Sequence, residues 1–523
     1  MSLTLVIGGT RSGKSGRAET LALATGLPVR YVATADGSDP AMAERIRRHA
    51  ERRPASWTTV EAGAQLGDAL ADTGGTCVLL DGLGPWVATA LHGAGAFDSP
   101  DAATLDAVRE RVMAEIELLA RAAAGPDPLI VVAEEAGQGV LPPDAASRAW
   151  LDLVGDAKRR LAEVAERVEL VVAGRPLALG GAPGPAEGLR GHGDAELSPG
   201  LADHAVNVLS GGPPDWLRAI LHETLDANGH SYPDERHAAA ALAALHGRAP
   251  EEVVPTNGAA EALWLLPAAL RPTLAACVHP AFTEAEAALR AHGVPVTRVL
   301  RDPDRDFALD PAAVPDAADL VVVGNPASPS GTLDPAAALL ALRRPGRVVA
   351  VDEAFMDLVP GEPGSLVRER LDDVIVVRSL TKSMALPGVR AGYAVAAPAL
   401  AERLRTVRPP WSANALALAA LTAIAERPHE LAAAAERADG ERADLAERLG
   451  RLAGVRMWPG AANFCLIEVA DGPGVVAALR EHGIAVRPAA SFPGLGPGHL
   501  RVTARSAPEN ERVARALAEA VES

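Results

Sequence analysis

The sequence predicts an α/β protein in which a parallel-sheet domain precedes a larger α/β domain that ends in a smaller α+β unit. Short apolar runs alternate with helical stretches over the first 175 or so residues, and the alternation resumes near residue 191. A stretch rich in Gly and Pro separates the two series. Strand–helix alternation is typical of parallel sheets with helices on both faces. The length of 523 residues fits roughly two to four domains.

The N-terminal series is predicted to form a first domain over residues 1–178. Helices are expected near residues 15–24, 41–52, 103–123 and 145–166. The predicted strands are Leu3–Ile7, Val29–Ala33, Cys77–Leu80, Leu129–Ala133 and Val168–Val172. Residues 179–190 have no periodicity and many glycines and prolines, which is typical of a linker.

The second series is predicted to form one domain over residues 191–523. Its larger part has predicted strands at Glu252–Pro255, Leu274–Val278, Val294–Leu300, Leu320–Gly324, Val348–Val351 and Val374–Val377. A stretch rich in Ala, Leu and Glu, from Trp411 to about residue 452, is strongly helical. The smaller unit follows, with predicted strands at Val455–Trp458, Phe464–Val469, Ile484–Arg487 and Leu500–Ala504.

The overall composition excludes several classes of protein. Hydrophobic residues make up 48% and charged residues 22%, as in globular proteins. The formal net charge of −17 argues against sequence-independent binding of nucleic acid or anionic lipid. No apolar run is long enough for a membrane span, the N-terminus has no signal-peptide pattern, and the three cysteines lie far apart in apolar runs. We therefore expect a cytoplasmic protein with buried, unpaired cysteines.

Lysine is rare in this chain, and its rarity is informative. Of the 50 basic residues, only Lys14, Lys158 and Lys382 are lysines. Arginine stays protonated and cannot act as a nucleophile. Lysines that are retained in such an arginine-rich composition are therefore candidates for chemistry, although chance retention is the alternative.

A glycine-rich loop stands between the first predicted strand and the helix that follows it. It matches the pattern G-x-x-x-x-G-K-[ST] and consists of Gly8, Gly9, Thr10, Arg11, Ser12, Gly13, Lys14 and Ser15. The backbone N–H groups of such a loop hold phosphates at a helix N-terminus. We expect Lys14 to reach the terminal phosphates of ATP or GTP and Ser15 to hold Mg²⁺. Asp81 ends a later strand, where a carboxylate near the metal is expected; its alternative role is a helix cap.

A histidine stands among arginines in the segment that follows the second predicted strand. On a helix, His49 has Arg45 one turn before it and Arg52 and Arg53 one turn after it. Taken alone, such a face is usually a solvated basic surface. Beside a phosphate loop, it places an imidazole where phosphates gather, so that the ring could attack the α-phosphate of a nucleotide.

These motifs together resemble the bifunctional adenosylcobinamide kinase/adenosylcobinamide-phosphate guanylyltransferase family of cobalamin synthesis. The resemblance covers residues 1–175 and rests on the glycine-rich loop, on Tyr31-Val-Ala-Thr-Ala, on the run Arg-Ile-x-x-His-x-x-x-Arg-Pro-x-x-Trp-x-Thr-x-Glu that ends at Glu61, and on Leu80-Asp81. It implies that His49 carries a transient GMP group and that adenosylcobinamide and GTP are substrates. It also implies that the nucleotide site is completed by Ala33, Thr34, Ala35, Glu61 and Asp81.

The sequence departs from the family pattern at three places. Glu134-Glu135 stands where the family has Asn-Glu, Gly84-Pro85 where it usually has Thr, and Lys158 where Asn is common. Lys158 is either a compensating site residue or a surface lysine, and we favour the surface. The departures leave open a second hypothesis, in which this domain binds nucleotide with partial or no catalysis.

The third lysine stands just beyond a predicted buried strand. The run Val376-Val-Arg-Ser-Leu-Thr-Lys-Ser-Met-Ala-Leu-Pro-Gly-Val-Arg surrounds Lys382 with hydroxyls at Ser379 and Thr381 and a guanidinium at Arg390. A lysine amine forms an imine with an aldehyde cofactor, while hydroxyls and arginine hold the phosphate of that cofactor. The run therefore points to pyridoxal 5'-phosphate (PLP).

Three upstream motifs fit the same cofactor. Asp352 ends a strand, where its carboxylate could pair with a protonated pyridine nitrogen. Asn325 opens a turn-rich loop and could bond the ring hydroxyl, whereas residues 256–261 open a helix whose N–H groups could bind phosphate. Each motif is weak alone, since Asp352 could be a helix cap and Asn325 a turn residue. In this order, with the lysine last, they predict a PLP enzyme.

Residues 191–523 resemble fold-type-I PLP enzymes, in the branch that holds histidinol-phosphate aminotransferase and threonine-phosphate decarboxylase. The resemblance implies covalent attachment of the cofactor at Lys382, Asp352 on the pyridine nitrogen, Asn325 on the hydroxyl and Phe282 stacked on the ring. It implies a phosphate site made by Ala259, Ala260, Ser379, Thr381 and Arg390, helped by Tyr232 from a partner subunit, and hence a homodimer. The candidate substrate-binding residues are Asn207, Asn414 and Arg501, with Arg501 on the substrate carboxylate.

The resemblance leaves two reactions open, decarboxylation of O-phospho-L-threonine to aminopropanol phosphate and transamination. Phe355 replaces the tyrosine that is common in the aminotransferases, and the run from Pro409 to Asn414 resembles the decarboxylase. The N-terminal domain adds a third hint, because aminopropanol phosphate is the side arm of the cobinamide phosphate on which that domain would act. We therefore favour the decarboxylase.

Overall fold

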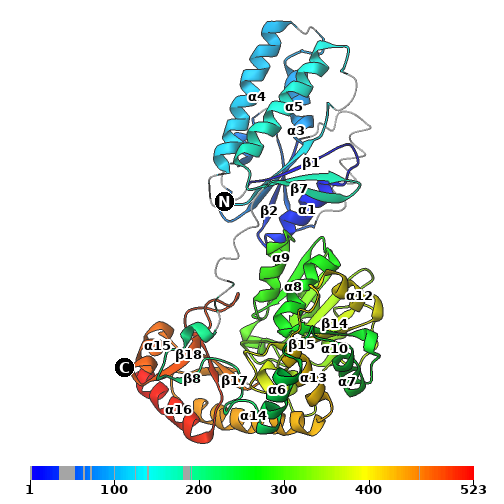
Figure 1. Cartoon of the computed structure of the whole chain (residues 1–523). Coiled ribbons are helices and arrows are strands. Elements are labelled where there is room, and N and C mark those ends of the chain that lie inside the picture. Colours follow the sequence, from blue (N-terminus) through cyan, green and yellow to red (C-terminus); the bar gives the residue numbers. More distant parts are fainter. Residues whose placement is uncertain are drawn as a thin grey trace. The chain divides into compact units, whose positions relative to one another are not determined.

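The computed structural model in Figure 1 describes residues 3–34, 54–62, 65–70, 73–98, 101–123, 125, 127–137, 141–180, 189, 191, 193–458 and 460–522. The chain divides into two compact units, Met1–Gly184 and Pro185–Ser523. The helix expected over 41–52 and most of the expected linker lie outside the described residues. No helix in the described ranges has the length and apolar character needed to cross a membrane.

A seven-stranded sheet forms the centre of the N-terminal unit, in the order β3-β2-β4-β5-β1-β6-β7. Its strands are β1 (Leu3–Gly8), β2 (Val29–Ala33), β3 (Thr58–Glu61), β4 (Cys77–Asp81), β5 (Leu129–Glu134), β6 (Arg167–Val172) and β7 (Arg175–Gly180). All neighbours pair in parallel except β6 and β7. The carboxyl ends of β1 to β5 therefore meet at one edge, where the candidate nucleotide residues lie.

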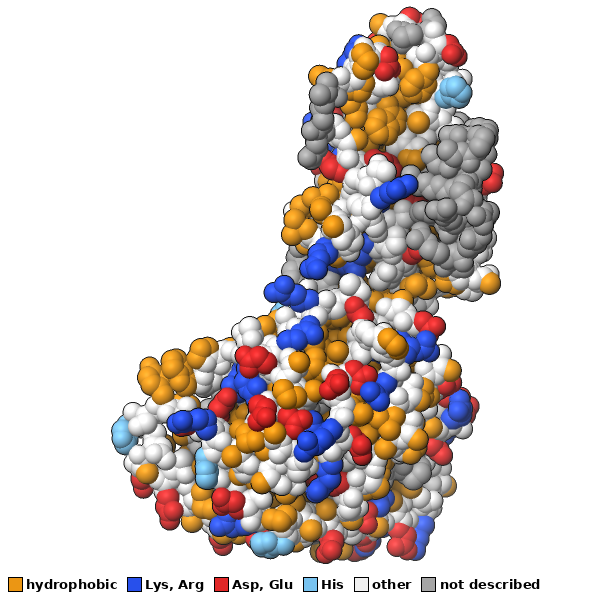
Figure 2. Space-filling model, turned by 90° about the vertical axis from the view of Figure 1, so that its right-hand side faces the viewer, with side chains coloured by type: hydrophobic (Ala, Val, Ile, Leu, Met, Phe, Trp, Pro, Cys, Tyr) orange, Lys and Arg blue, Asp and Glu red, His pale blue; other side chains and the backbone are white. Residues whose placement is uncertain are grey.

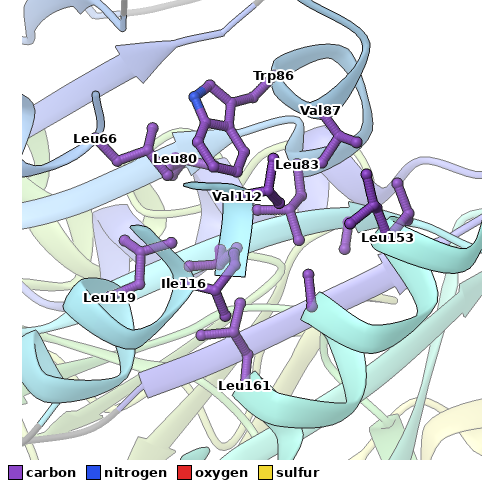
Figure 3. Packing of buried hydrophobic residues seen from close by; sticks show 14 of the residues in the cluster. Leu66, Leu80, Leu83, Trp86, Val87, Val112, Ile116, Leu119, Leu153 and Leu161 are labelled. Carbon is purple, nitrogen blue, oxygen red and sulfur yellow. The ribbon is translucent and has the colours of Figure 1, made fainter. Parts of the chain in front are cut away.

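Helices cover both faces of this sheet, as the alternating sequence predicted. They are α1 (Lys14–Ala24), α3 (Leu83–Gly93), α4 (Ala102–Ala122) and α5 (Ala145–Val164). Side chains from α3, α4 and α5, among them Trp86, Ile116 and Leu161, form one buried cluster on the sheet (Figure 3). Residues of α1 such as Ala18 and Leu21 pack on the opposite face.

The larger part of the C-terminal unit is built on a mixed seven-stranded sheet in the order β11-β10-β12-β13-β14-β15-β9. Its strands are β9 (Val253–Asn257), β10 (Ala275–His279), β11 (Val296–Leu300), β12 (Leu320–Gly324), β13 (Val348–Asp352), β14 (Val374–Ser379) and β15 (Ala391–Ala396). Only β15 runs antiparallel to both of its neighbours. Strands β13 and β14 are parallel neighbours, so Asp352 and Ser379 end at the same edge.

A five-stranded sheet in the order β16-β17-β19-β18-β8 forms the smaller part of this unit. Its strands are β8 (Ala202–His204), β16 (Arg456–Trp458), β17 (Phe464–Glu468), β18 (Ile484–Pro488) and β19 (His499–Thr503). Leucines and valines of three helices, α14, α15 and α16, pack against it. On the face that Figure 2 shows, acidic and basic side chains are interspersed over the C-terminal unit.

The helices of the C-terminal unit surround both sheets. They are α6 (Asp215–Asn228), α7 (Arg236–His246), α8 (Gly258–Leu270), α9 (Glu284–Ala291), α10 (Ala336–Leu340), α11 (Leu380–Ser383), α12 (Pro398–Val407), α13 (Ala415–Ala425), α14 (Pro428–Leu449), α15 (Gly472–Glu481) and α16 (Ala507–Glu522). The helical stretch after Trp411 is divided into α13 and α14 at Pro428, because proline has no N–H to continue α13. The three cysteines are buried and unpaired, as predicted.

Candidate active sites

The glycine-rich loop connects β1 to α1 and turns tightly around its own backbone. The N–H of Ser12 donates to the carbonyl of Gly9 at 3.2 Å. A side chain at position 8 would place its Cβ 2.9 Å from the carbonyl oxygen of Val171, and Gly13 has a φ of +95°, so both positions favour glycine. The loop ends at the N-terminus of α1, which is the arrangement that binds phosphate.

A carboxylate and two hydroxyls meet next to this loop. Ser15 Oγ donates to Asp81 Oδ1 at 2.9 Å, and the Tyr31 hydroxyl donates to Asp81 Oδ2 at 2.5 Å. Asp81 ends β4 and thus lies at the same sheet edge as the loop. Oxygen ligands of this kind suit Mg²⁺, and binding of Mg²⁺ by Ser15 and Asp81 stays a prediction.

Lys14 lies in the loop with a second carboxylate beside it. Its Nζ donates to the carbonyl of Gly9 at 3.4 Å and lies 3.8 Å from Glu134 Oε1. Burial raises the pKa of Glu134, an effect that the charge of Lys14 opposes. In the sequence, Glu134 stands out only as a departure from the family pattern; in the structure, it lies beside the lysine of the phosphate loop.

Of the other predicted nucleotide residues, those that the structure describes lie along the same edge of the sheet. Ala33 and Glu61 end β2 and β3 and stand opposite each other in register. Thr34 Oγ1 donates to the carbonyls of Asp81, at 3.0 Å, and Gly82, at 2.6 Å. Ala35 and His49 lie outside the described residues.

Lys158 differs from our expectation of a surface lysine. Its side chain is only 14% exposed, and its Nζ forms an ion pair with Glu135 Oε2 at 2.8 Å. The preference for a surface charge is therefore wrong, because Lys158 neutralises the carboxylate that follows β5.

The C-terminal unit contains a cavity of about 690 Å³ at the edge where β13 and β14 end. Most of the residues predicted for the PLP site line it: Asn207, Ala259, Ala260, Phe282, Asp352, Ser379, Thr381, Lys382, Arg390 and Arg501. These residues come from both sheets and from the starts of α8 and α11. The cavity is large enough for a cofactor and a small substrate.

Several residues that line the cavity are of the kinds that bind phosphate. Helix α8 begins at Gly258, whose φ of +77° and missing side chain let Arg390 Nη2 approach; a Cβ there would lie 2.7 Å from that nitrogen. The side chain of Ser379 accepts a hydrogen bond from the N–H of Thr381 at 3.3 Å. A helix N-terminus, two hydroxyls and a guanidinium thus converge, which fits the phosphate of PLP.

Asp352 and Lys382 lie in the same cavity at the ends of neighbouring strands. Burial raises the pKa of Asp352 to about 6, and its main bonding partner is the N–H of Ala354 at 3.1 Å. Burial makes the charged form of this carboxylate unfavourable, and a protonated pyridine nitrogen beside it would stabilise that charge. Lys382 Nζ lies 5.5 Å from the centre of the Phe355 ring. The donor set therefore fits PLP.

Two buried arginines of the smaller sheet also line the cavity. Arg501 donates to Ser328 Oγ at 3.1 Å and to the carbonyl of Ala205 at 2.6 Å, but its buried Nε has no hydrogen-bond partner among the described residues. Burial lowers the pKa of Arg501 to about 9. Arg487 stands opposite Arg501 in register on β18 and also lines the cavity. Two buried guanidiniums next to each other are a candidate site for an anion.

Arg487 is a candidate that the sequence analysis missed. It donates to the carbonyl of Gly191 at 2.6 Å and to Ser491 Oγ at 2.8 Å. The available signal was a single arginine in an otherwise apolar strand, Ile484-Ala-Val-Arg487. Asn207, which was predicted, also lines the cavity and accepts a hydrogen bond from Thr503 Oγ1 at 2.8 Å.

Three predicted residues do not line the cavity in the described structure. Asn325 is buried and exchanges two hydrogen bonds with the backbone of Asp334, at 2.7 and 3.2 Å. Asn414 caps α13. Tyr232 is 77% exposed and stacks on the Trp411 ring, with 4.4 Å between centroids. Their roles toward cofactor, substrate and a partner subunit stay predictions.

Comparison with known proteins agrees with both halves of this description. Residues 4–179 match the model of the cobinamide kinase/cobinamide phosphate guanyltransferase family, and residues 202–518 match that of the class I and II aminotransferases. A histidinol-phosphate aminotransferase of Mycobacterium tuberculosis is 44% identical over 341 residues, which cover 64% of this chain and 92% of that protein. The threonine-phosphate decarboxylase of Salmonella typhimurium is 32% identical over 333 residues, covering 61% and 90%.

A solved structure shows the same fold. The L-threonine-O-3-phosphate decarboxylase of Porphyromonas gingivalis superposes with a TM-score of 0.56 at 24% identity, covering 61% of this chain and 98% of that one. The family matches confirm the two resemblances predicted from the sequence, one for each half of the chain. The chain belongs to the class I and II aminotransferases and carries, in the same polypeptide, a domain of the cobinamide kinase/cobinamide phosphate guanyltransferase type.

Proposed function

We propose that the chain is a cobalamin-biosynthesis enzyme with two active sites. The N-terminal domain transfers phosphate to adenosylcobinamide and GMP to the resulting phosphate, and the C-terminal domain decarboxylates O-phospho-L-threonine. The observation that supports the second activity most directly is one cavity that combines Lys382 and Asp352 with the buried pair Arg487 and Arg501. Two guanidiniums suit a substrate with two anionic groups, a carboxylate and a phosphate.

The residues on the cofactor side have distinct tasks. Ser379, Arg390 and the first N–H groups of α8 would bind the cofactor phosphate, and Phe282 would cover the ring. Asp352 would bond the ring nitrogen and favour its protonated form. PLP, when bound, withdraws the electron pair that is left on the substrate α-carbon when a bond to that carbon breaks. Lys382 would hold the cofactor covalently, and its amine could also move a proton at the substrate α-carbon.

The residues on the substrate side set the orientation. Among the described residues, the Nε–H of Arg501 has no hydrogen-bond partner, and two further N–H groups lie on the same planar fork. The side chain could therefore bind a carboxylate or a phosphate through two parallel hydrogen bonds. Arg487 lies beside it for the second anion. Burial of both side chains excludes water and strengthens each charge–charge contact.

Decarboxylation and transamination differ in which bond to the α-carbon breaks. Phe355 lines the cavity where the aminotransferases commonly have tyrosine, so a hydroxyl is missing near Lys382. The product of decarboxylation would also serve the pathway of the N-terminal domain. The 44% identity to a histidinol-phosphate aminotransferase supports a second candidate, transamination of histidinol phosphate.

Product analysis distinguishes the two reactions. The enzyme with PLP is incubated with O-phospho-L-threonine, and separately with histidinol phosphate and a keto acid. Carbon dioxide and aminopropanol phosphate support the decarboxylase, whereas a keto acid with aminated cofactor or turnover of histidinol phosphate supports the aminotransferase. Turnover of neither substrate contradicts both.

A covalent-labelling experiment tests the N-terminal activity. After incubation with α-labelled GTP, label should remain on the denatured protein, and His49→Ala should abolish it while nucleotide binding at residues 8–15 is largely retained. Equal loss of label and binding would assign His49 a structural role. Absence of label on the wild-type protein would favour a nucleotide-binding module.

A further inference from the structure

Two departures of the N-terminal domain from its family pattern lie against each other in the structure. Gly84 lies in the first turn of α3, directly after Leu83, and Glu134 is the last residue of β5. The N–H of Gly84 donates to Glu134 Oε2 at 2.6 Å. The glycine and the glutamate therefore form one structural unit, although 50 residues separate them.

Position 84 has room for the glutamate because it has no side chain. A Cβ at Gly84 would overlap the Glu134 carboxylate and would lie 2.9 Å from Cζ2 of Trp150. The Gly84 backbone is held from the other side as well, because Trp150 Nε1 donates to its carbonyl at 2.8 Å. One oxygen of Glu134 is thus fixed in place by a backbone donor that itself cannot move freely.

The other oxygen of Glu134 faces the phosphate loop. Strand β5 is the direct neighbour of β1, and Glu134 pairs in register with Gly8, the first residue of the loop. Glu134 Oε1 lies 3.8 Å from Lys14 Nζ, with side chains that are 20% and 5% exposed. Since Lys14 is the residue expected on the terminal phosphates, this oxygen lies within 4 Å of the amine that would contact them.

The next carboxylate in the chain has a different environment. Glu135 forms its ion pair with Lys158, at 2.8 Å, and its N–H donates to the carbonyl of Gly8. The two adjacent glutamates therefore differ in function: one charge is neutralised by a dedicated lysine, and the other shares the lysine of the loop.

We propose that Glu134 is a catalytic residue of phosphoryl transfer, which accepts the proton of the hydroxyl that attacks the terminal phosphate of the bound nucleotide. This inference rests on the proposed kinase function. In the step, a bond forms between the acceptor oxygen and the terminal phosphorus, the bond from that phosphorus to the bridging oxygen breaks, and the nucleoside diphosphate leaves. The hydroxyl proton goes to Glu134 Oε1. A base that is oriented by a second group is the usual arrangement for activating a nucleophile.

The local electrostatics support this role. Burial raises the pKa of Glu134, which makes its carboxylate a better proton acceptor than an exposed one. An ionised carboxylate also repels the nucleotide phosphates, so it weakens ground-state binding while it assists the reaction. A residue with both effects separates affinity from turnover when it is changed.

The test uses the full chain and Glu134→Gln, which keeps the shape and can still accept the hydrogen bond of Gly84. Nucleotide affinity is measured by equilibrium titration, and terminal-phosphate transfer is measured to adenosylcobinamide and to water. We expect Glu134→Gln to bind nucleotide at least as tightly as the wild type. Its rate of phosphate transfer should fall by about a hundredfold or more, which is the usual contribution of a general base.

Two controls accompany this variant. Glu135→Gln removes a charge one residue further along and should leave transfer within a few-fold of the wild type. Gly84→Thr should overlap Glu134 and lower transfer, whereas Gly84→Thr with Glu134→Asn, which restores the family pair, should bind nucleotide normally.

The outcomes separate the inference from the proposed function. If Glu134→Gln transfers phosphate as fast as the wild type, the catalytic role of Glu134 is wrong and the kinase function stands. If the variant loses nucleotide affinity and transfer in parallel, the carboxylate is structural, and the catalytic role is again wrong. A wild-type protein that binds nucleotide but transfers phosphate to neither acceptor overturns both the kinase function and the role of Glu134.

Discussion

Arg378 shows how a single buried residue supports the cofactor site. It lies next to Ser379 in sequence, and its guanidinium contacts Glu353 at 3.0 Å and Asp357 and Glu362 at 2.6 Å each. Glu353 in turn follows Asp352. One cation thus holds three carboxylates behind the two strand ends that carry the cofactor residues.

Arg378→Met should destabilise the protein by about 3–5 kcal/mol, because it leaves buried carboxylates without a partner. Burial and the neighbouring carboxylates raise the pKa of Asp357 from 3.8 to about 6. Between pH 3.8 and about 6, Asp357 therefore keeps its proton in the folded chain and releases it in the unfolded chain. Through this carboxyl group, lowering the pH stabilises the folded state. Urea unfolding should show a larger loss at pH 7 than at pH 5, and an equal loss at both would contradict this account.

Lys382→Arg tests the attachment of the cofactor. The substitution keeps charge and bulk, but a guanidinium stays protonated and has no nucleophilic lone pair. We expect the variant to fold, to lose the borohydride-stable link to PLP and all turnover of the amino acid, and to keep the GTP chemistry of the N-terminal domain. Absorbance spectra and mass spectrometry of the reduced protein measure the link; retained turnover would remove this assignment.

At the level of elements, the phosphate cradle depends on close packing between β15 and the start of α8. A Cβ at Gly392 would lie 2.5 Å from the carbonyl carbon of Gly258 and 2.6 Å from the N–H nitrogen of Ala259. Gly392→Ala should push the helix N-terminus away from the phosphate, at a cost of about 1–3 kcal/mol. PLP titration should show an affinity about ten- to a hundredfold lower.

Gly388→Ala is the matched control for that substitution. Gly388 precedes the same strand, but a Cβ there meets nothing within 4 Å. PLP affinity should stay within about twofold of the wild type, since a surface substitution of this kind changes free energies by less than about 0.5 kcal/mol. Equal effects of the two substitutions would show that packing on α8 does not matter.

The elements also show what the sequence could and could not predict. Buried strands rich in Val, Ile and Leu were predicted within one or two residues, as β12 (Leu320–Gly324) shows. Strand β15 was missed, because Ala391-Gly-Tyr-Ala-Val-Ala consists mostly of small residues and its role becomes clear only through pairing with β14 and β9. Strand β7 was missed because it contains Pro176, and α3 because it opens with Leu83-Gly-Pro.

The same limit applied to the candidate site. The proximity of Lys382 and Asp352 was predictable from the sequence. Asp352 ends β13 and Lys382 follows β14, and these two strands are neighbours both in sequence and in the sheet. Arg487 was not, because an antiparallel pairing with β19 brings it opposite Arg501. Glu134 was visible only as a departure, and its meaning required the distance to Lys14.

At the level of the whole molecule, each unit has its own sheets and its own buried clusters. The described residues of the segment that leads into the C-terminal unit nevertheless contribute to its cavity. Thr283 Oγ1 donates to the carbonyl of the buried Leu189, Arg487 donates to that of Gly191, and Gly191 and Gly193 line the cavity.

Two truncations follow from this arrangement. A protein of residues 185–523 should fold, bind PLP and turn over its amino acid like the full chain, because all of its cavity residues are present. A protein of residues 194–523 should bind PLP but show a higher KM for the amino acid, since the wall next to Arg487 is lost. Steady-state kinetics of both proteins measure this difference, and equal KM values would contradict a role for the segment.

The placement of the three lysines has a practical consequence. Lys14 is in the phosphate loop, Lys158 is mostly buried in an ion pair with Glu135, and Lys382 faces the PLP cavity. No lysine amine of this protein is therefore a freely solvated surface group. Amine-selective labels, which modify many surface lysines on most proteins, should here report on ligand occupancy. Bound nucleotide should protect Lys14, and bound PLP should protect Lys382. Peptide mapping after reaction with one reagent would therefore follow both candidate sites at once.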